Sequence, residues 1–424
     1  MIVEIHGKKQ MMTTNTKDSD NIRLPEAWQG KAYMLMAVGL GLICISGLVF
    51  FIGYSELRAE ALKAFMHSYL ANFMYCMTFG IGAMFFVLIS FLTRASWNAS
   101  IRRWAEIISM TIPWMALLFV PILLMVLVNK ATPLYEWNQA KETITESIVA
   151  EKTDYLNGPF FTARAVICLL LWTAIVSYYF RMSRKEDETG NVDLTLARQK
   201  WSGPMVMLFA LSVSMASFDW IMSLDADWFS TIFGVYLFAA SMFGFFAFMI
   251  VSLMLLQRSG MVKGYVNTEH YHDMGKFLFG FTMFWSYIAF SQLLLYWYGN
   301  IPEETAWFKD RLLGDWAYLS YGSIALHFAI PFLGMMSRHV RRHRFGITFW
   351  ACWALLAHWL DMTFLVMPNV GPLTVPMIFG HVLCGLGMFS IFSAMVLVRA
   401  SGVPLVALRD PRLPEGMSYA NPIL

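Results

Sequence analysis

The composition of this chain of 424 residues is that of a membrane protein rather than of a soluble domain. Hydrophobic residues make up 58% of the chain and charged residues only 14%, whereas a soluble domain usually carries about a quarter of charged residues. The formal net charge of +3 also argues against nucleic acid as a partner, because nucleic-acid-binding proteins carry strong basic patches.

Ten apolar stretches are each long enough to cross a bilayer as a helix, which requires roughly 20 residues. The stretches are continuously apolar rather than alternating, which favours helices over the strands of a closed barrel. The fifth and sixth are separated only by a polar turn at 225–228. We therefore predict an all-α integral membrane protein with ten transmembrane helices. Their expected bounds are 33–53, 69–92, 107–128, 160–181, 204–224, 229–256, 276–298, 316–336, 347–366 and 377–398.

The ends of the chain are predicted to be tails on one side of the membrane. Residues 1–30 lack the apolar segment of a cleavable signal peptide, so we expect an N-terminal tail (1–30), a membrane domain (31–400) and a C-terminal tail (401–424). Most of the 31 Lys and Arg residues lie in these tails and in the loops on their side. The positive-inside rule therefore places both termini in the cytoplasm.

The longest loop, residues 129–159, is expected on the outer side and is rich in acidic residues. Its 142–151 stretch is compatible with a short helix. Loops of this length usually have a role. Two interpretations remain open, a solvated cap and a docking surface for an external partner.

Cofactor motifs are absent from the sequence. None of the 5 cysteines lies in a C-x-x-C or C-x-x-C-H motif, so covalent haem, iron–sulfur and zinc sites are not predicted. The embedded histidines are too few for a paired-histidine diheme bundle, although a single haem held by His327 and His358 remains an alternative. No Gly-rich phosphate loop supports ATP-driven transport.

A weak internal repeat relates the two halves of the membrane domain. The similar segments 181–184 and 336–338 end the fourth and eighth helices, and Asp219 and Asp361 each lie near a Trp late in the fifth and ninth. A shift of four helices preserves direction, so the repeat is parallel. It predicts two four-helix bundles, formed by helices 2–5 and 6–9, with helices 1 and 10 flanking them.

Ionisable residues inside the membrane are costly and are candidates for function by default. Asp361 and His358 are three residues apart in the ninth helix, so they share one face. A carboxylate beside an imidazole is suited to proton transfer near neutral pH. The alternative is a structural ion pair of Asp219 or Asp361 with Arg164, in the first turn of the fourth helix. The candidate residues are Asp219, Asp361, His358, His327 (in the eighth helix), Arg164, Asp225 (in the turn) and His67 (just before the second helix).

One stretch is similar to a known family. Residues 217–236, SFDWIMSLDADWFSTIFGVY, resemble membrane proteins related to NrfD and to PsrC, the membrane component of polysulfide reductase. The particular resemblance is to the smaller of two such proteins in bacterial alternative complex III, the ActF type. Segments 271–277 and 357–361 fit the same family, and the resemblance covers nearly all of the membrane region. It implies ten helices in two bundles, in the inner (cytoplasmic) membrane of a bacterium.

The resemblance also implies a role in a respiratory quinol:cytochrome c (or other electron-acceptor) oxidoreductase. The chain would be a non-catalytic subunit that binds no redox centre of its own. It would contribute a proton path, part of a quinol site near the periplasmic side, or both, and the candidate residues would serve there. The implied partners are quinol, the lipid bilayer, a larger NrfD-like paralogue, a periplasmic iron–sulfur subunit and c-type cytochromes of the same complex, which hold the haems and iron–sulfur clusters.

Two other functions remain as alternatives. A secondary transporter usually has broken helices and polar groups at the midplane, whereas here the polar groups lie in the outer half and no expected helix has a clear Gly or Pro break at its centre. A structural anchor for periplasmic cytochromes would work through the acidic outer loops. On the inner side, His270, His272 and Asp273 mark either the entrance of a proton path or a solvated loop.

Overall fold

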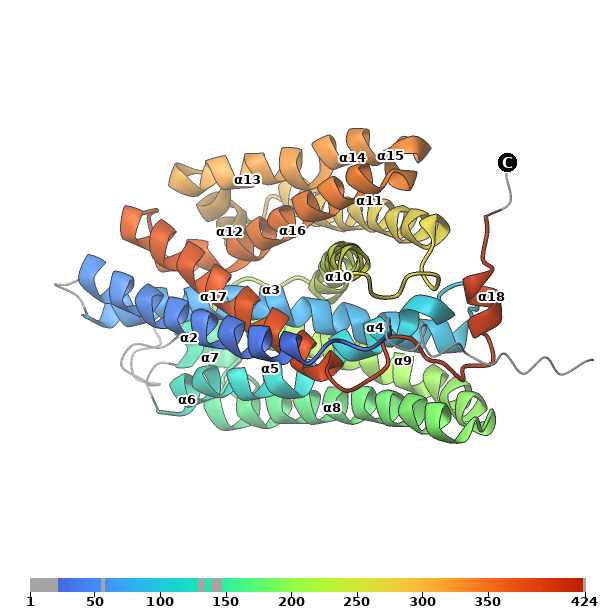
Figure 1. Cartoon of the computed structure of the whole chain (residues 1–424). Helices are drawn as coiled ribbons and strands as arrows, with labels where there is room; N and C mark the ends of the chain where they lie inside the picture. Colours follow the sequence, from blue (N-terminus) through green and yellow to red (C-terminus); the bar gives the residue numbers. More distant parts are fainter. Residues whose placement is uncertain (1–21, 55–57, 129–133, 139–146, 422–424) are drawn as a thin grey trace, which may run out of the picture.

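A computed structural model describes residues 22–54, 58–128, 134–138 and 147–421 (Figure 1). Within these residues, 10 helices are long and apolar enough to cross a membrane, which confirms the predicted all-α, ten-span fold. The number of spans is even, and the backbone N–H of Leu405 donates to the carbonyl of Ile22 at 2.7 Å. Both ends of the membrane domain therefore lie on one side, which we call the tail side. We call the opposite side, with residues 134–138, 225–232 and 300–313, the loop side.

The spans follow the predicted order along the chain. They are α2 (Ala27–Gly53), α3 (Arg58–Leu92), the consecutive α4 (Ala99–Ser109), α5 (Ile112–Leu118) and α6 (Val120–Val128), α8 (Gly158–Thr189), α9 (Asp193–Trp220), α10 (Phe233–Arg258), α11 (Thr268–Gly299), the consecutive α13 (Ala317–Ser323), η6 (Ile324–Ala329) and α14 (Ile330–Met335), α16 (Arg344–Val366) and α17 (Val375–Ala400). Short helices outside the spans are α7 (Ser147–Glu151), α12 (Pro302–Leu312), α15 (Arg338–Arg342) and α18 (Leu413–Met417).

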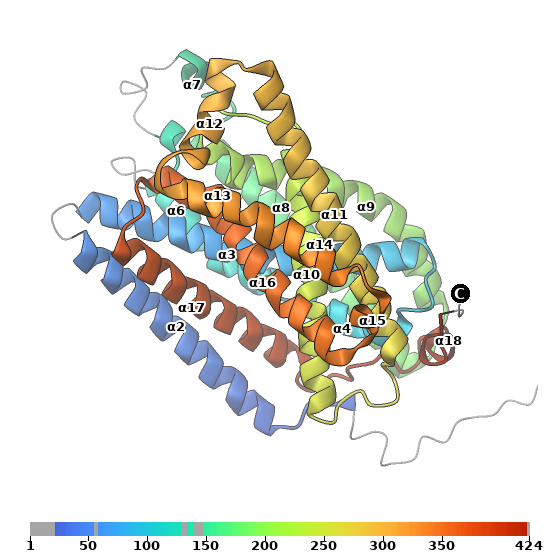
Figure 2. The ribbon, with the colours of Figure 1, turned by 90° about the horizontal axis from the view of Figure 1, so that it is seen from above.

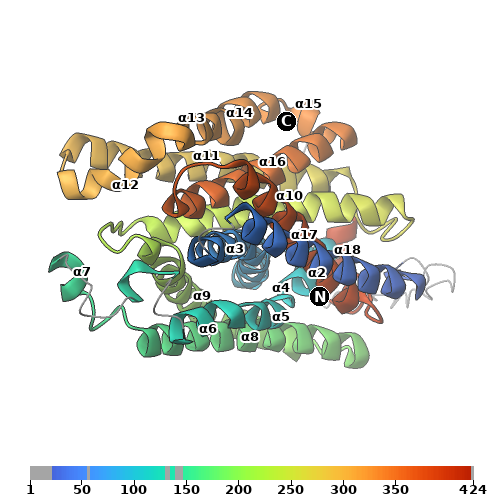
Figure 3. The ribbon, with the colours of Figure 1, turned by 90° about the vertical axis from the view of Figure 1, so that its left-hand side faces the viewer.

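The spans form the two predicted four-helix bundles. Helices α3, α4–α6, α8 and α9 make the first bundle, and α10, α11, α13–α14 and α16 make the second. In Figures 1 and 3 the second bundle, in yellow to orange, lies above the first, in light blue to green. Helices α3 and α10 are the most buried spans and pack against each other where the bundles meet.

The first and last spans pair with each other along the side of the bundles, as Figure 2 shows. Their contact is close because glycines face each other. A Cβ added at Gly39 of α2 would lie 2.7 Å from the carbonyl oxygen of Gly387 in α17 and 2.6 Å from Cγ1 of Ile391. Small residues allow membrane helices to approach in this way.

Two spans are interrupted, which contradicts the expectation of unbroken helices. The third span is divided into α4, α5 and α6, with Pro113 and Pro121 near the start of α5 and α6. The eighth contains the π-helical segment η6, followed by Pro331 at the start of α14. Proline lacks the N–H that would bond to the carbonyl four residues earlier, and its ring crowds that carbonyl. For Pro331 that carbonyl belongs to His327, inside η6.

Several helices begin earlier than hydropathy predicted. Helix α3 includes His67, which was expected just before the helix, and α4 includes residues 99–106, which were expected in a loop. Hydropathy misses such ends because it does not count polar turns that other parts of the protein cover. Of the expected short helix at 142–151, α7 confirms Ser147–Glu151, and residues 142–146 lie outside the described residues.

Candidate functional site

Two of the three candidate carboxylates, Asp219 and Asp361, lie inside transmembrane helices, and these helices belong to different bundles. Asp219 of α9 forms a bidentate ion pair with Arg164 of α8, with Nε–Oδ2 and Nη2–Oδ1 distances of 2.7 and 3.0 Å. The third nitrogen, Nη1, donates to the carbonyl of Tyr155 at 2.9 Å. Both side chains are buried. Because the two charges satisfy each other, this pair fits the structural interpretation, a tie between adjacent helices.

Asp361 of α16 has no cationic partner among the described residues. Its carboxylate accepts hydrogen bonds from two neutral donors, the hydroxyl of Tyr236 in α10 and Nε1–H of Trp285 in α11, the latter at 3.1 Å. Only 1% of Asp361 is exposed. A buried carboxylate without a countercharge is expensive, and such groups occur mainly where a proton must be taken up or released.

His327 lies in the π-helical segment η6 and is connected to this carboxylate through Trp285. Its ring stacks on the indole of Trp285, with centroids 3.6 Å apart and planes 3° apart, and its other face lies against Phe243 of α10. It is 1% exposed, and neither ring nitrogen has a hydrogen-bond partner within the described part of the chain. π-Helical segments are frequent at functional sites, and an unpaired buried imidazole indicates a place for a ligand, a water or a proton.

His358 faces the interface between the bundles, one helical turn from Asp361. Its Nε2 makes a 2.7 Å hydrogen bond with Oγ1 of Thr78 in α3. The ring packs on Gly244 of α10, where an added Cβ would lie 2.6 Å from its Cδ2. In the described residues Nδ1 has no partner, and no hydrogen bond joins His358 to Asp361.

A cavity of about 420 Å³ lies next to Asp361, in the loop-side half of the second bundle. Its walls come from α10, α11, α12, α13, η6 and α16, and they are mainly apolar and aromatic. Tyr236, Trp285 and Asp361 are among its lining residues, and the other polar residues of the lining are Ser286, Gln292, Ser320 and Ser323. Tyr287 and Phe290, also in the lining, are 65% and 61% exposed, so the cavity extends to the outer surface of the helices. A flat ring with hydroxyl groups would suit a site of this kind.

The other candidate residues lie elsewhere. His67 binds the carbonyl of Lys63 through Nδ1 at 2.8 Å, within its own helix. Asp225 lies in the turn before α10, where its Oδ1 accepts a hydrogen bond from the backbone N–H of Trp228 at 3.4 Å. Burial raises the pKa of Asp225, and the positive charge of Arg311 opposes that shift. The candidate residues therefore do not form one group. In the described part of the chain, Phe243 contacts both His327 and His358, and Trp285 connects His327 to Asp361.

The sequence interpretation missed both hydrogen-bond partners of Asp361, and it also missed the buried Arg311. Tyr236 ends the stretch that resembles the NrfD-related family, but nothing in its spacing singles it out. Trp285 looks like any Trp of a membrane helix. Arg311 lies outside the ten expected spans, yet α12 holds it buried against the end of α16. Only the folded contacts distinguish these residues from others of their type.

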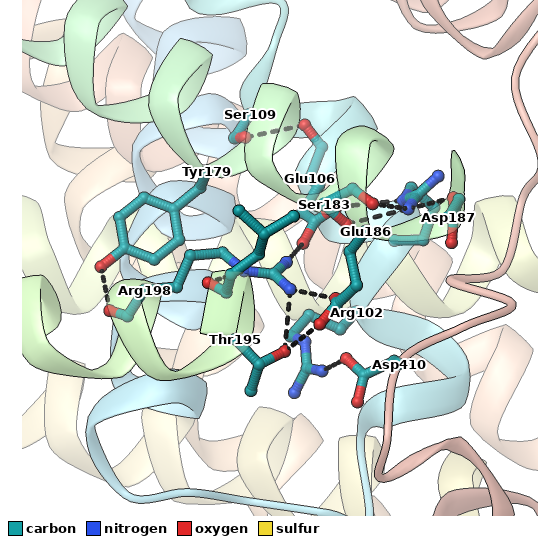
Figure 4. Close-up of polar contacts among 12 residues, drawn as sticks. Arg102, Glu106, Ser109, Tyr179, Ser183, Glu186, Asp187, Thr195, Arg198 and Asp410 are labelled. Carbon is teal, nitrogen blue, oxygen red and sulfur yellow. Dashed lines mark hydrogen bonds and ion pairs between the residues drawn. The ribbon is translucent and has the colours of Figure 1, made fainter. Parts of the chain in front are cut away.

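A second buried polar cluster lies at the tail side of the first bundle (Figure 4). Arg103 of α4 binds Glu106 at 3.0 Å and Asp187 of α8 at 2.6 Å. Arg198 of α9 pairs with Glu186 of α8. These residues are largely buried, although residues 99–106 were expected in a loop. The cluster joins three helices of the first bundle, and we interpret it as structural.

The C-terminal segment closes this side of the molecule. Asp410 pairs with the buried Arg102 of α4. Further along, Tyr419 donates its hydroxyl to Asp273 of α11 at 2.6 Å, and Asn421 Nδ2 donates to the same carboxylate at 3.1 Å. The segment thus contacts both bundles.

The residues that were expected at an inner entrance lie under this segment. His270, His272 and Asp273 are in the first turns of α11 and are buried, so the solvated-loop interpretation is wrong.

Comparison of the sequence with models of protein families gave no match, and comparison with curated proteins gave no significant match either.

Proposed function

We propose that this chain is a membrane subunit of a respiratory quinol:electron-acceptor oxidoreductase, and that it holds a quinol ring in the cavity beside Asp361. The observation that carries the proposal is a buried carboxylate with only neutral donors at the wall of an aromatic cavity open to the outer surface of the helices. The resemblance of segments 217–236 and 357–361 to NrfD-related proteins supports it independently.

The cavity suits the first chemical step of quinol oxidation. Quinol must lose two protons as it gives up two electrons, and a carboxylate within hydrogen-bonding reach is a suitable proton acceptor. Asp361 would take a proton from a quinol hydroxyl, while the Tyr236 hydroxyl and the Trp285 N–H stabilise the carboxylate before transfer. His327, whose ring nitrogens are free in the described residues, is the next group that a released proton would meet. The electrons would pass to the iron–sulfur and haem groups of partner subunits.

The proposed orientation follows from charge. The basic tails and loops favour a cytoplasmic location for the tail side, in the inner membrane of a bacterium. The loop side would then face the periplasm, and Asp361, near the loop-side end of α16, would release protons towards it. The larger NrfD-like paralogue, the iron–sulfur subunit and the cytochromes would be the partners.

A secondary transporter is the second candidate, because the third span is interrupted near its middle and the eighth contains a π segment. Transporters use interrupted helices to build substrate sites. Purification in mild detergent separates the two functions. The respiratory function predicts that haem-containing subunits accompany the chain, and an isolated, haem-free chain would favour transport.

The deciding experiment compares Asp361→Asn with Asp225→Asn in the purified complex. The first variant removes the proton acceptor and keeps the shape of the side chain, so quinol oxidation should fall by roughly 10²-fold, as for loss of a general base. The second removes an acid outside the cavity and should keep near-normal activity. Unchanged activity of Asp361→Asn, in a complex with its full set of subunits, would contradict the proposal.

A further inference from the structure

Arg311 of α12 is a buried cation that no carboxylate neutralises directly. Its side chain is 1% exposed. Its Nε donates to the carbonyl of Phe364 at 3.3 Å, Nη1 to that of Trp307 at 3.1 Å, and Nη2 to that of Leu365 at 3.1 Å and to Oδ1 of Asn369 at 2.8 Å. Every partner is neutral, and no ion pair in the described residues includes Arg311.

The guanidinium lies directly behind the cavity wall. Its central carbon is 3.7 Å from the ring centroid of Trp307, and Trp307 lines the cavity. Phe364, whose carbonyl accepts from Arg311, also lines the cavity and follows Asp361 by one helical turn. One side chain therefore separates the positive charge from the space beside Asp361.

A role in packing alone does not explain why this residue is charged. The carbonyls of Phe364 and Leu365 lie at the end of α16, where unpaired helix carbonyls carry partial negative charge. A neutral amide would satisfy such carbonyls without the large cost of burying an unpaired charge. The protein instead retains a guanidinium, whose field reaches much further in a low-dielectric interior than a hydrogen bond does.

We propose that Arg311 is a positioning residue that fixes a positive charge beside the cavity and favours the deprotonated form of a bound quinol. The proposal rests on the proposed function. As the O–H bond of one quinol hydroxyl breaks, its proton passes to Asp361 and the negative charge stays on the quinol oxygen. The guanidinium stabilises that charge through the wall formed by Trp307, while its hydrogen bonds hold α12 against α16.

The charged groups around Arg311 are consistent with this role. The carboxylates that act on it are Asp225 in the turn before α10 and Asp310 on α12 itself, and the neutral Tyr236 hydroxyl of α10 also lies near it. Burial outweighs these groups and lowers the pKa of Arg311 to about 9. Arg311 thus remains protonated at neutral pH. The negative charge that Arg311 would stabilise, on the oxygen of the bound quinol, would lie in the same loop-side half of the second bundle.

The test measures kcat, KM and the pH profile of quinol oxidation in the intact complex, with a short-chain quinol as substrate. Arg311→Met should lower kcat more than it raises KM. The pH of half-maximal activity should rise by about one unit, as expected for loss of a charge roughly one side chain away. Asn369→Ala is the matched control, because it removes one hydrogen bond to Arg311 and keeps the charge. It should leave the pH profile unchanged.

Arg311→Lys tests the charge itself, even if the Met variant fails to assemble. It should act almost normally near neutral pH and lose activity at an alkaline pH that the native protein tolerates, because a buried ammonium gives up its proton more readily. A native pH profile in both variants would overturn the proposal. If Asp361→Asn still lowers quinol oxidation by roughly 10²-fold, only the role of Arg311 fails. If Asp361→Asn is also active, the proposed function itself fails.

Discussion

The imidazole of His327 lies parallel to the indole of Trp285, with 3.6 Å between the ring centroids. The same indole donates its N–H to Asp361. One side chain therefore connects the unpaired histidine of the π segment to the uncompensated carboxylate of α16. This relationship gives Trp285 two separable roles, as a stacking surface and as a hydrogen-bond donor.

Substitution Trp285→Phe should separate these roles. It keeps an aromatic face for His327 and removes the donor to Asp361, so the carboxylate loses one of its two hydrogen bonds. We expect quinol oxidation to fall by roughly 10-fold, equivalent to about 1.4 kcal/mol, which is near the lower limit for one hydrogen bond to a charged group. Trp172→Phe is the control, since its N–H donates to Ser212 in the first bundle at 2.8 Å. Equal activities of the two variants would contradict the role of the Trp285 donor.

Neutralising Asp219, which is paired with Arg164, and neutralising Asp361, which has no cationic partner in the described residues, should have opposite effects on the stability of the protein. Asp219→Asn leaves a buried guanidinium without its countercharge and should destabilise the protein by about 3–5 kcal/mol. Asp361→Asn removes a buried charge that has no cationic partner, so it should leave stability unchanged or increase it. Thermal unfolding in detergent measures the stability of both variants. A double variant, Arg164→Met with Asp219→Asn, should recover part of the loss, and failure to recover any of it would argue against direct coupling.

The contact between Asp410 and Arg102 should depend on pH. Burial opposes ionisation of Asp410, yet the guanidinium of Arg102 outweighs it and lowers the pKa of Asp410 below its ordinary value. A depressed carboxyl pKa stabilises the folded state above the unfolded pKa, about 4, and this contribution is lost as the pH falls through the folded value. We therefore expect residues 401–421 to become accessible to hydrogen exchange below about pH 4.

A pair of variants tests that assignment at neutral pH. Asp410→Asn should expose the same segment without any change of pH, because it removes the negative charge directly. Asp193→Asn, at the exposed start of α9, should not. Protection of 401–421 that stays constant in acid and in Asp410→Asn would show that other contacts hold the segment.

The contact between α2 and α17 should tolerate no side chain at Gly39. An added methyl group would meet Ile391 and the Gly387 carbonyl at less than van der Waals distance, so Gly39→Ala should cost about 1–3 kcal/mol through overpacking. Gly41→Ala is the control, since an added Cβ there meets nothing within 4 Å. Thermal unfolding of the two variants compares one methyl group at two positions of the same helix. Equal stabilities would show that the helices can separate at little cost.

The sequence was sufficient for the spans because hydropathy depends on composition over a whole helix. The sequence was less informative about where the helices begin and where two of the spans are interrupted. Arg102 and Arg103 looked like loop residues, since a charged segment that other parts of the protein cover has the same composition as one that water covers. The π segment was missed because the effect of Pro331 on the carbonyl of His327 depends on how the neighbouring helices hold the turn.

The candidate site could be predicted only in part, because the neighbours of a buried acid depend on the fold and not on the local sequence. An acid inside a membrane helix is conspicuous, so Asp219 and Asp361 were both identified. Whether such an acid is neutralised depends on which helix lies beside it, and only the fold distinguishes the Arg164 partner of Asp219 from the neutral donors of Asp361. The partners of Asp361 come from α10 and α11, far from it in sequence, and they carry no local signal.

The C-terminal segment has a consequence for biosynthesis. Residues 401–421 leave the ribosome after all ten spans, and they bind α4 through Asp410 and α11 through Tyr419. These contacts between the tail-side ends of the two bundles therefore form only after translation has passed the membrane domain, and they add to the earlier contact of Trp104 in α4 with Ser252 in α10. A chain that stops before Asp410 would insert its helices and still leave Arg102 without a countercharge. Cellular proteases that recognise loose membrane proteins would then have a means of distinguishing interrupted chains from finished ones.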